Sequence, residues 1–332
     1  MGASLFWLRA ENDNRTGGYG LDGTNPYSDA MDFIGLTVPL TFDGVKVTPW
    51  AMVGMIGRDS LDTDKDAISQ KGGLIPIQAD ISPDALKDRH NTAWWVGVAS
   101  ELTYFDPFRI AVDAAYGSVD MGSYKTLDGR TIRDFDVKRA GWFASILGEY
   151  KMDYFTPGIL FWYASGDDSN AYNGSERMPA ISPCGNFTSF VGDDPTGFGM
   201  LVSGLNATYD LQLNYAGTWG LGIQIKDVSF IEDLTHTLRI ARWAGTNSPA
   251  MIKYLASTDG AGNRMSYLTT HDSMIECNLD SVYTFSENLS AHIQFGYVLN
   301  QMDMGAWNPS YRHEDLKTAD AYKASAMLYY TF

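Results

Sequence analysis

The sequence predicts an all-β fold, a transmembrane antiparallel up-and-down β-barrel in which residues 1–332 form a single domain. Three observations favour this fold. Side chains alternate between apolar and polar along most of the chain, aromatic residues stand at both ends of the apolar faces, and short connections alternate with long ones. Period two is the spacing of a strand, because successive side chains point to opposite faces of a sheet.

Composition narrows the class further. The chain carries 24 Lys and Arg against 40 Asp and Glu, for a net charge of −16, which excludes a basic nucleic-acid groove as the main surface. Aromatic residues make up 13% of the chain and glycines number 33, as is typical of strands and tight turns. No apolar run approaches the roughly 18 residues of a membrane-spanning helix. Two cysteines, Cys184 and Cys277, are too few for a disulfide framework.

Strand alternation is clearest between Phe108 and Ser118. Phe108, Ile110 and Val112 share one face with Ala114 and Tyr116, while charged and small residues occupy the other. Applied along the chain, the same test predicts about twelve strands, an even number as expected for such barrels. They cover residues 3–11, 29–41, 44–57, 91–105, 108–118, 138–152, 155–165, 215–230, 234–246, 270–285, 288–300 and 320–332.

The placement of aromatic residues separates a membrane barrel from a soluble sandwich, which also alternates. Eight to ten residues at roughly 3.3 Å each, tilted by about 40°, cover about 20–25 Å, the height of the apolar band between two aromatic girdles. Aromatic rings with a polar end favour that interface. The predicted membrane girdle consists of Trp94, Tyr104, Phe108, Tyr116, Trp142, Tyr150, Phe155, Tyr163, Tyr297, Tyr322, Tyr330 and Phe332.

Connection lengths give the same prediction. Short turns fall at 42–44, 106–107, 152–154, 231–234 and 286–288. Long outer loops are expected at 12–28, 58–90, 119–137, 166–214, 246–269 and 301–319. Short connections on one rim and long ones on the other are the arrangement of a transmembrane barrel. Loop 166–214, rich in apolar residues, is the first candidate to narrow the pore and loop 58–90 the second; the alternative for 166–214 is packing over the rim or against a neighbouring subunit.

The polar face of each strand is expected to line the lumen. Hairpin geometry places Lys226 opposite or diagonal to Arg239, and Asp280 near His292. Facing basic and acidic groups would set up a transverse field across a pore, whereas local pairing would merely hydrate the wall, and both interpretations stay open. The predicted pore-lining residues are Lys46, Glu101, Arg109, Asp113, Arg139, Glu149, Lys151, Lys226, Arg239, Glu276, Asp280, His292 and Lys323.

Motifs for catalysis and for metal binding are incomplete. Asp62-x-Asp64-x-Asp66 opens like a calcium loop, but Ala67 and Gly73 stand where Gly and Glu are needed. The five histidines form no i, i+4 pair. His292, Asp280 and Ser290 invite comparison with a hydrolase triad, without a visible oxyanion donor. We therefore predict no enzymatic activity, no metal and no cofactor.

Three segments carry a family resemblance. The terminal strand Ala321–Phe332 with its closing Phe, the turn-strand unit Thr41–Trp50 and the strand exit Tyr163–Asp168 resemble the outer-membrane homotrimeric porins, general-porin-like β-barrels of bacteria. Such porins usually carry about sixteen strands and a signal peptide. This chain shows about twelve strands and no signal peptide. We expect it to lack its N-terminal strands and the complete protein to have sixteen; the alternative is a closed twelve-stranded barrel.

The resemblance implies a function. We expect a pore in the Gram-negative outer membrane for passive diffusion of small hydrophilic solutes and ions, assembled as a homotrimer in contact with lipid and lipopolysaccharide. Acidic loops predict a mild cation preference. One alternative is a substrate-specific channel, with Trp95, Trp162 and Trp243 as an aromatic path for sugars. The other is a soluble, secreted carbohydrate-active β protein.

Overall fold

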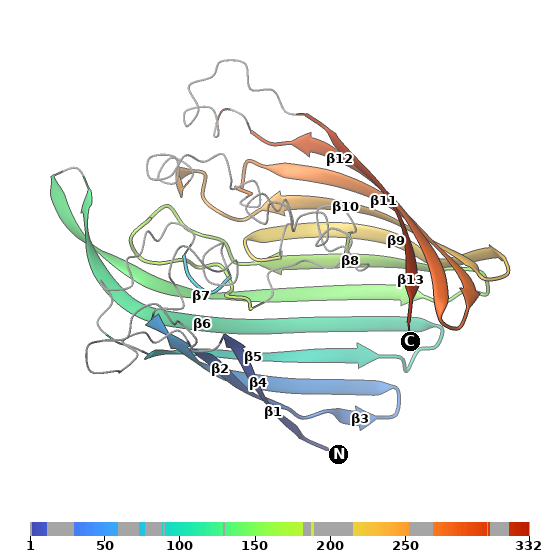
Figure 1. Ribbon diagram of the computed structural model, residues 1–332, viewed down its shortest axis with the longest axis horizontal. Coiled ribbons are helices and arrows are strands. Elements are labelled where there is room, and N and C mark those ends of the chain that lie inside the picture. The colour runs from blue at the N-terminus through green and yellow to red at the C-terminus, as the bar shows by residue number, and fades with distance from the viewer. Residues whose placement is uncertain are drawn as a thin grey trace.

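The computed structural model describes residues 2–11, 30–58, 73–76, 88, 90–128, 130–181, 187–188, 215–251, 268–303, 305 and 319–331. Strands dominate this part of the chain (Figure 1). They are β1 (Ser4–Glu11), β2 (Met31–Thr37), β3 (Leu40–Phe42), β4 (Val45–Gly57), β5 (His90–Leu102), β6 (Phe108–Asp128), β7 (Thr131–Tyr150), β8 (Thr156–Ala164), β9 (Thr218–Ile231), β10 (Leu234–Gly245), β11 (Ser273–Ser286), β12 (Leu289–Gln301) and β13 (Ala321–Tyr330).

All thirteen strands belong to one antiparallel sheet. Its order is β1-β2-β4-β5-β6-β7-β8-β9-β10-β11-β12-β13, with the short β3 paired to β4, so each long strand lies beside the one that precedes it. The sheet is strongly curved (Figure 1). β1 and β13 stand at its two ends, and no pairing in the described residues joins them. The predicted all-β, up-and-down fold is confirmed, while the sheet is not closed.

The twelve predicted strands correspond to these elements, with the predicted strand 29–41 divided into β2 and β3. One predicted loop is wrong. Residues 119–137 are not a loop, since β6 continues to Asp128 and β7 begins at Thr131. Paired residues run up to Asp128 and Thr131, and the hairpin projects past the other strands (Figure 1). The base of the hairpin alternates the other way round from the wall, because its apolar residues are buried and its polar ones are exposed; the buried ones are Val119, Met121, Phe135 and Val137.

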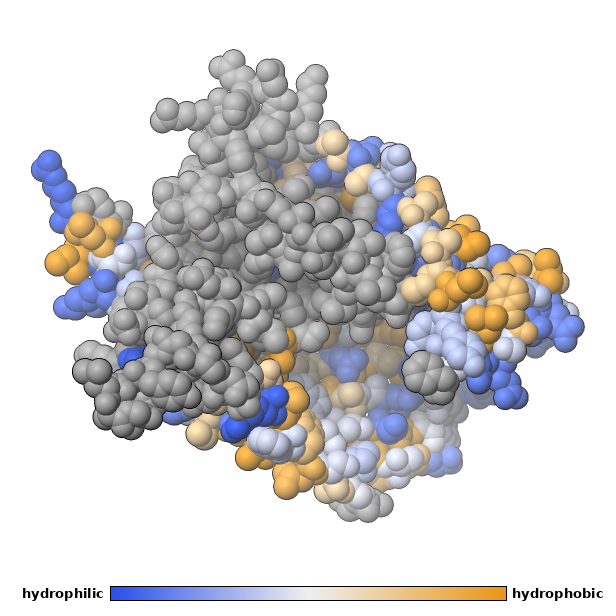
Figure 2. Space-filling view, in the orientation of Figure 1, coloured by the Kyte–Doolittle hydropathy of each residue, from blue (hydrophilic) through white to orange (hydrophobic). Residues whose placement is uncertain are grey.

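The two faces of the sheet differ in exposure. Trp94 points outward and is 41% exposed, while the next residue, Trp95, points inward and is 2% exposed. Outward aliphatic residues such as Ile146 and Ile223 are about half exposed along the wall. Figure 2 shows apolar residues on the outside of the sheet, at the right of the view. Within the described part of the chain, no helix is long and apolar enough to cross a membrane.

The inner face has two zones. Toward the long loops it is apolar, with one buried cluster around Phe33, Trp95 and Phe135 and another around Trp162 and Trp243. Toward the short turns it is polar, as described below. The apolar zone is covered from inside by pieces of the long connections, since Leu74, Ile75 and Phe187 belong to these clusters.

Candidate functional site: a polar belt and an internal segment

Inward polar residues of neighbouring strands, directly paired or diagonal, form a row that crosses the sheet near the short turns. Lys46 on β4 pairs with Glu101 on β5, and Arg109 on β6 pairs with Glu149 on β7. The row then passes over β8 to Gln224 on β9, which pairs with Arg239 on β10. Paired residues of antiparallel strands lie on the same face, so this row is one continuous strip of the inner wall. We call it the polar belt.

Ion pairs link the first half of the polar belt. The Arg109 guanidinium lies between two carboxylates, with Nε 2.5 Å from Glu101 Oε1 and Nη1 2.6 Å from Glu149 Oε2. Glu149 also accepts from Lys226, whose Nζ lies 2.6 Å from Oε1, and from Gln224 Nε2 at 2.8 Å. The Glu149 side chain is 2% exposed and therefore sits at the centre of this network.

A glycine allows Glu149 to reach across an intervening strand. Gly158 on β8 lies between Glu149 and Gln224 in the register. A Cβ at Gly158 would stand 3.1 Å from both the Glu149 and the Gln224 side chains, closer than nine in ten real Cβ contacts. Glycine in a strand interior marks such a close approach. Sequence reasoning missed Gly158 and Gln224, although an inward glycine between polar neighbours was the available signal.

The second half of the polar belt continues to the last strand. Arg239 Nη1 lies 2.6 Å from Asp280 Oδ2 on β11. Asp280 pairs with Gln294 on β12, and the Ser325 hydroxyl on β13 donates to Gln294 Oε1 at 3.3 Å. The belt thus spans β4 to β13. Basic and acidic side chains pair locally along it, which supports the interpretation that these charges hydrate the wall.

The two hairpin placements predicted from the sequence are both diagonal, and these side chains bond to other partners. Arg239 stands opposite Gln224, with Lys226 only diagonal to it, and Lys226 pairs with Glu149 instead. His292 is diagonal to Asp280, because it pairs with Val282. The His292 ring nitrogen Nε2 contacts the Ser290 hydroxyl at 2.9 Å, while the Asp280 carboxylate holds Arg239. These contacts do not form a relay of Ser, His and Asp.

The other predicted pore-lining residues occupy varied positions. Asp113 on β6 pairs with Ser145, and Lys323 on β13 pairs with Gly296, both on the inner face. Lys151 lies just past β7 in an exposed turn, so it belongs to the rim. Glu276 is inward but fully buried, with Asn278 Nδ2 donating to it at 2.7 Å. Neither Lys151 nor Glu276 is therefore part of the polar belt.

Arg139 requires a correction, because it does not line open space. It is fully buried beneath residues 165–181, which we call the internal segment. Its Nη2 donates to Met178 O at 2.8 Å and its Nε to Arg177 O at 3.2 Å. Trp95 Nε1, on β5, also donates to the internal segment, at Pro179 O and 2.9 Å. The Arg139 guanidinium therefore holds the backbone of the internal segment against the inner face of the sheet, instead of facing solutes.

The internal segment also extends the sheet locally. Above the point where β8 leaves β7, Ser175 forms a parallel bridge with Arg139. Ala140 N donates to Ser175 O and Ser175 N donates to Lys138 O, at 2.9 and 2.8 Å. Gly174 adopts φ +94, and a Cβ there would stand 2.4 Å from Lys138 O. This part of loop 166–214 therefore continues the sheet beside β7 beyond the end of β8, while residues 177–179 lie over the inward side chains of Arg139 and Trp95.

A buried asparagine ties the long connections together. Asn247, after β10, accepts from Asp167 N through Oδ1 and donates to Gly217 O and Leu268 O through Nδ2. It thereby joins the ends of β8, β9, β10 and β11 at one point. Ser175 and Arg177 complete this junction, because the Ser175 hydroxyl donates to Asp167 and Arg177 Nη2 donates to Ala216 O at 3.0 Å.

Glu176, in the internal segment, has a carboxyl group whose pKa is shifted. Burial raises the pKa of Glu176, and the nearby carboxylates of Asp168 and Asp167 raise it too, while the backbone N–H of Asp168 acts in the opposite direction. Among the described residues, no group of three or more His, Cys, Asp or Glu side chains is arranged to hold a metal ion. The Asp62–Asp66 pattern lies outside the described residues.

The inward tryptophans are buried and are not a path for solutes. Trp162 on β8 crosses Gly220 on β9 to reach Trp243 on β10, with ring centroids 4.6 Å apart. Tyr215 stacks on Trp243 at 5.7 Å. Trp162 and Trp243 have no exposed surface and Trp95 has 2%, so the aromatic path expected for a sugar channel is not present in this structure.

The outward aromatics form pairs at two heights. Near the long loops, Trp142 and Tyr163 stack at 5.0 Å, and Trp94 and Tyr116 lie 5.3 Å apart. Near the short turns, Phe108 and Tyr150 meet edge to face at 4.7 Å. The remaining predicted girdle residues with exposed or half-buried side chains are Tyr104, Phe155, Tyr297, Tyr322 and Tyr330, while Phe332 lies outside the described residues.

No protein-family model matches the chain, and no curated protein matches it. Among solved structures, the chain is similar to Salmonella typhi OmpF in complex with daunomycin, at 11% identity and a TM-score of 0.32 over 98% of this chain and 95% of that one. For Pseudomonas aeruginosa OpdO the identity is 12% and the TM-score 0.32, over 92% of this chain and 70% of that one. For an anion-selective porin from Comamonas acidovorans the identity is 9% and the TM-score 0.28, over 90% of each chain. Likeness at this level establishes no function, so the function of this chain has to be inferred from its own sheet.

Proposed function

We propose that this protein is an outer-membrane porin of the homotrimeric, general-porin-like class. It provides a water-filled pore through which small hydrophilic solutes and ions diffuse passively across the bacterial outer membrane. The observation that carries the proposal is the contrast between the two faces. One face bears a polar belt from β4 to β13, and the other exposes aliphatic and aromatic side chains along the wall. Such a pair of faces suits water on one side and lipid on the other.

The internal segment sets the width of this pore in our proposal. It is fixed to the wall by Arg139, Trp95 and the bridge at Ser175, so it behaves as part of the wall. Solutes then pass this segment at the long-loop end of the sheet and the polar belt near the short turns. A polar, charged constriction of this kind filters by size and by field.

A mild cation preference is part of the proposal. The ion pairs of the polar belt neutralise one another locally, so the net charge of −16 is carried elsewhere. An acidic surface around a pore raises the local concentration of cations. The soluble carbohydrate-active alternative has less support, because the outward aliphatic face has no second layer over it in the described residues.

Single-channel recording in a planar bilayer tests the proposal. Detergent-purified protein is expected to give ohmic openings in groups of three, and a salt gradient is expected to give a reversal potential of the sign that indicates cation preference. Inserted protein that conducts no ions would contradict the open pore. Single-step openings would contradict the trimer, and a reversal potential of the other sign would contradict the cation preference.

A further inference from the structure

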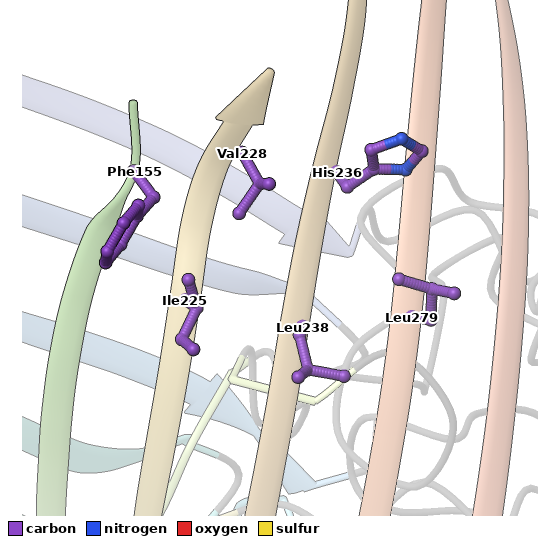
Figure 3. Close-up of a pocket in the computed structure, with 6 residues that line it drawn as sticks. All are labelled: Phe155, Ile225, Val228, His236, Leu238 and Leu279. Carbon is purple, nitrogen blue, oxygen red and sulfur yellow. The ribbon is translucent and has the colours of Figure 1, made fainter. Parts of the chain in front are cut away.

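A groove lies on the outer face of the sheet near the short turns. It has a volume of about 500 Å³, within the range of small-molecule sites, and is almost entirely apolar. In Figure 3 its side chains project from the near side of four neighbouring strands. The lining residues are Phe155, which directly precedes β8, Ile225 and Val228 from β9, His236 and Leu238 from β10, and Leu279 from β11.

An irregularity in the sheet creates this groove. Asp227 on β9 adopts φ 60, and the pairing between β9 and β10 shifts on both sides of His236. A β-bulge bends its strand and re-aims the side chains beside it. The wall is therefore indented where a regular sheet would present a continuous surface, and the indentation needs an apolar filling.

Polarity is ordered along the groove. Its one polar lining residue is His236, close to the turn 231–234, where Nδ1 contacts the Ser281 hydroxyl at 2.8 Å. Deeper into the wall, Ile225, Leu238 and Leu279 present only aliphatic surface. A polar end at the rim and an apolar length beyond it match an amphipathic chain that enters from the membrane surface.

The turns beside the groove are acidic. Asp153 lies in the turn before β8, and Asp227, Glu232 and Asp233 lie at the end of β9 and its turn. All four are exposed, and Lys151 is the one exposed cation of the same two turns. This charge suits a headgroup that carries an ammonium and disfavours one with net negative charge.

We infer that the groove binds one phospholipid with an ammonium headgroup, of the phosphatidylethanolamine type, from the leaflet at the short-turn rim. The ammonium lies among the acidic turns, the glycerol ester accepts a hydrogen bond from the His236 ring, and one acyl chain lies along Leu238 and Leu279. The inference rests on the membrane placement proposed above. It identifies a lipid site on the outside of the wall, separate from the pore.

Native mass spectrometry of the detergent-solubilised protein tests this site. Phosphatidylethanolamine is titrated into the wild type, into Leu238→Trp, which fills the groove, and into Ile240→Trp. Ile240 is the matched control, because it is the next outward residue of β10, is exposed to a similar extent (45% against 40%) and does not line the groove. The wild type and the control are expected to bind one lipid saturably, and Leu238→Trp about tenfold more weakly.

A second variant and a second lipid keep the test decisive. The wild type is expected to prefer phosphatidylethanolamine over phosphatidylglycerol, and His236→Leu is expected to keep the fold and to bind both lipids more weakly by the same factor, because the glycerol ester is common to both. Equal binding by Leu238→Trp and Ile240→Trp would overturn the inference, as would loss of the oligomer in Leu238→Trp alone, which would make the groove a contact between copies. Failure of the wild type to float with vesicles would instead contradict the membrane placement itself.

Discussion

Glu149 connects more of the polar belt than any other described side chain. Its carboxylate holds Arg109 and Lys226 from strands on either side, and its own side chain is almost fully buried. Removing one partner of a buried pair leaves uncompensated charge, which is far costlier than losing an exposed pair. The neighbouring Glu101 holds the same Arg109 but is 36% exposed, so it serves as a natural comparison.

Glu149→Gln is therefore expected to change ion selectivity more than Glu101→Gln. The first variant releases two cationic groups on the inner wall, whereas the second leaves Arg109 paired with Glu149. We expect the reversal potential of Glu149→Gln to move clearly toward anion preference and that of Glu101→Gln to move by less than half as much. Equal shifts in the two variants would contradict a central role for Glu149.

Glu176 gives the internal segment a pH dependence. A carboxyl whose pKa is raised by folding binds its proton more tightly in the folded state, so it favours that state at acid pH. This contribution is lost as the pH rises through the raised pKa. Hydrogen exchange of residues 165–181, corrected for the intrinsic effect of pH on exchange, is expected to be slower near pH 4 than near pH 7. Glu176→Gln is expected to abolish that difference, and an unchanged pH profile would contradict the assignment.

At the scale of the strand, two inward glycines let long side chains cross a neighbour. Gly158 lets Glu149 reach Gln224, and Gly220 lets Trp162 reach Trp243. Gly158→Val is expected to push Glu149 away from Gln224 and Lys226, lowering the melting temperature by several degrees. Gly148→Val is the control, because a Cβ there meets nothing within 4 Å. Equal melting temperatures for the two variants would show that the contact of Glu149 across Gly158 does not stabilise the protein.

The internal segment depends on Arg139. Arg139→Leu removes the donors that hold the Arg177 and Met178 carbonyls, and each unsatisfied buried group costs about 1–3 kcal/mol. We expect this variant to raise single-channel conductance severalfold, since the segment leaves the wall. Lys138→Leu, its exposed neighbour on β7, is expected to conduct like the wild type. Unchanged conductance in Arg139→Leu would mean that residues 165–181 do not narrow the pore.

Strands were predictable because their signal is local. Alternation over ten residues identified the wall and assigned Glu149 and Arg239 to its inner face. The projecting hairpin was not predicted, because its buried side chains are apolar and its exposed ones polar, the reverse of the wall. The ion pair of Lys226 with Glu149 was not predicted either, since Glu149 lies two strands away and is reached only across Gly158. Burial of Arg139 depends on a segment whose position no local pattern specifies.

For the whole molecule, the central question is which face meets water. Paired residues Ile146 and Val112 lie in mid-wall on the outer face, and Ser145 and Asp113 lie at the same height on the inner face. Ile146 is 47% exposed although it is aliphatic, so only lipid or another protein surface would cover it favourably. A soluble sandwich reverses this requirement, because its aliphatic face is the one that is buried.

Ile146→Arg and Ser145→Arg place the same charge one residue apart, on opposite faces. An arginine on the lipid face at mid-wall is expected to destabilise the protein by about 2–4 kcal/mol, whereas one on the water-filled side is tolerated. Folding into phospholipid vesicles, followed by the electrophoretic shift between folded and unfolded forms, measures both. Greater damage from Ser145→Arg would reverse the two faces. It would mean that the sheet encloses an apolar core and that water lies outside.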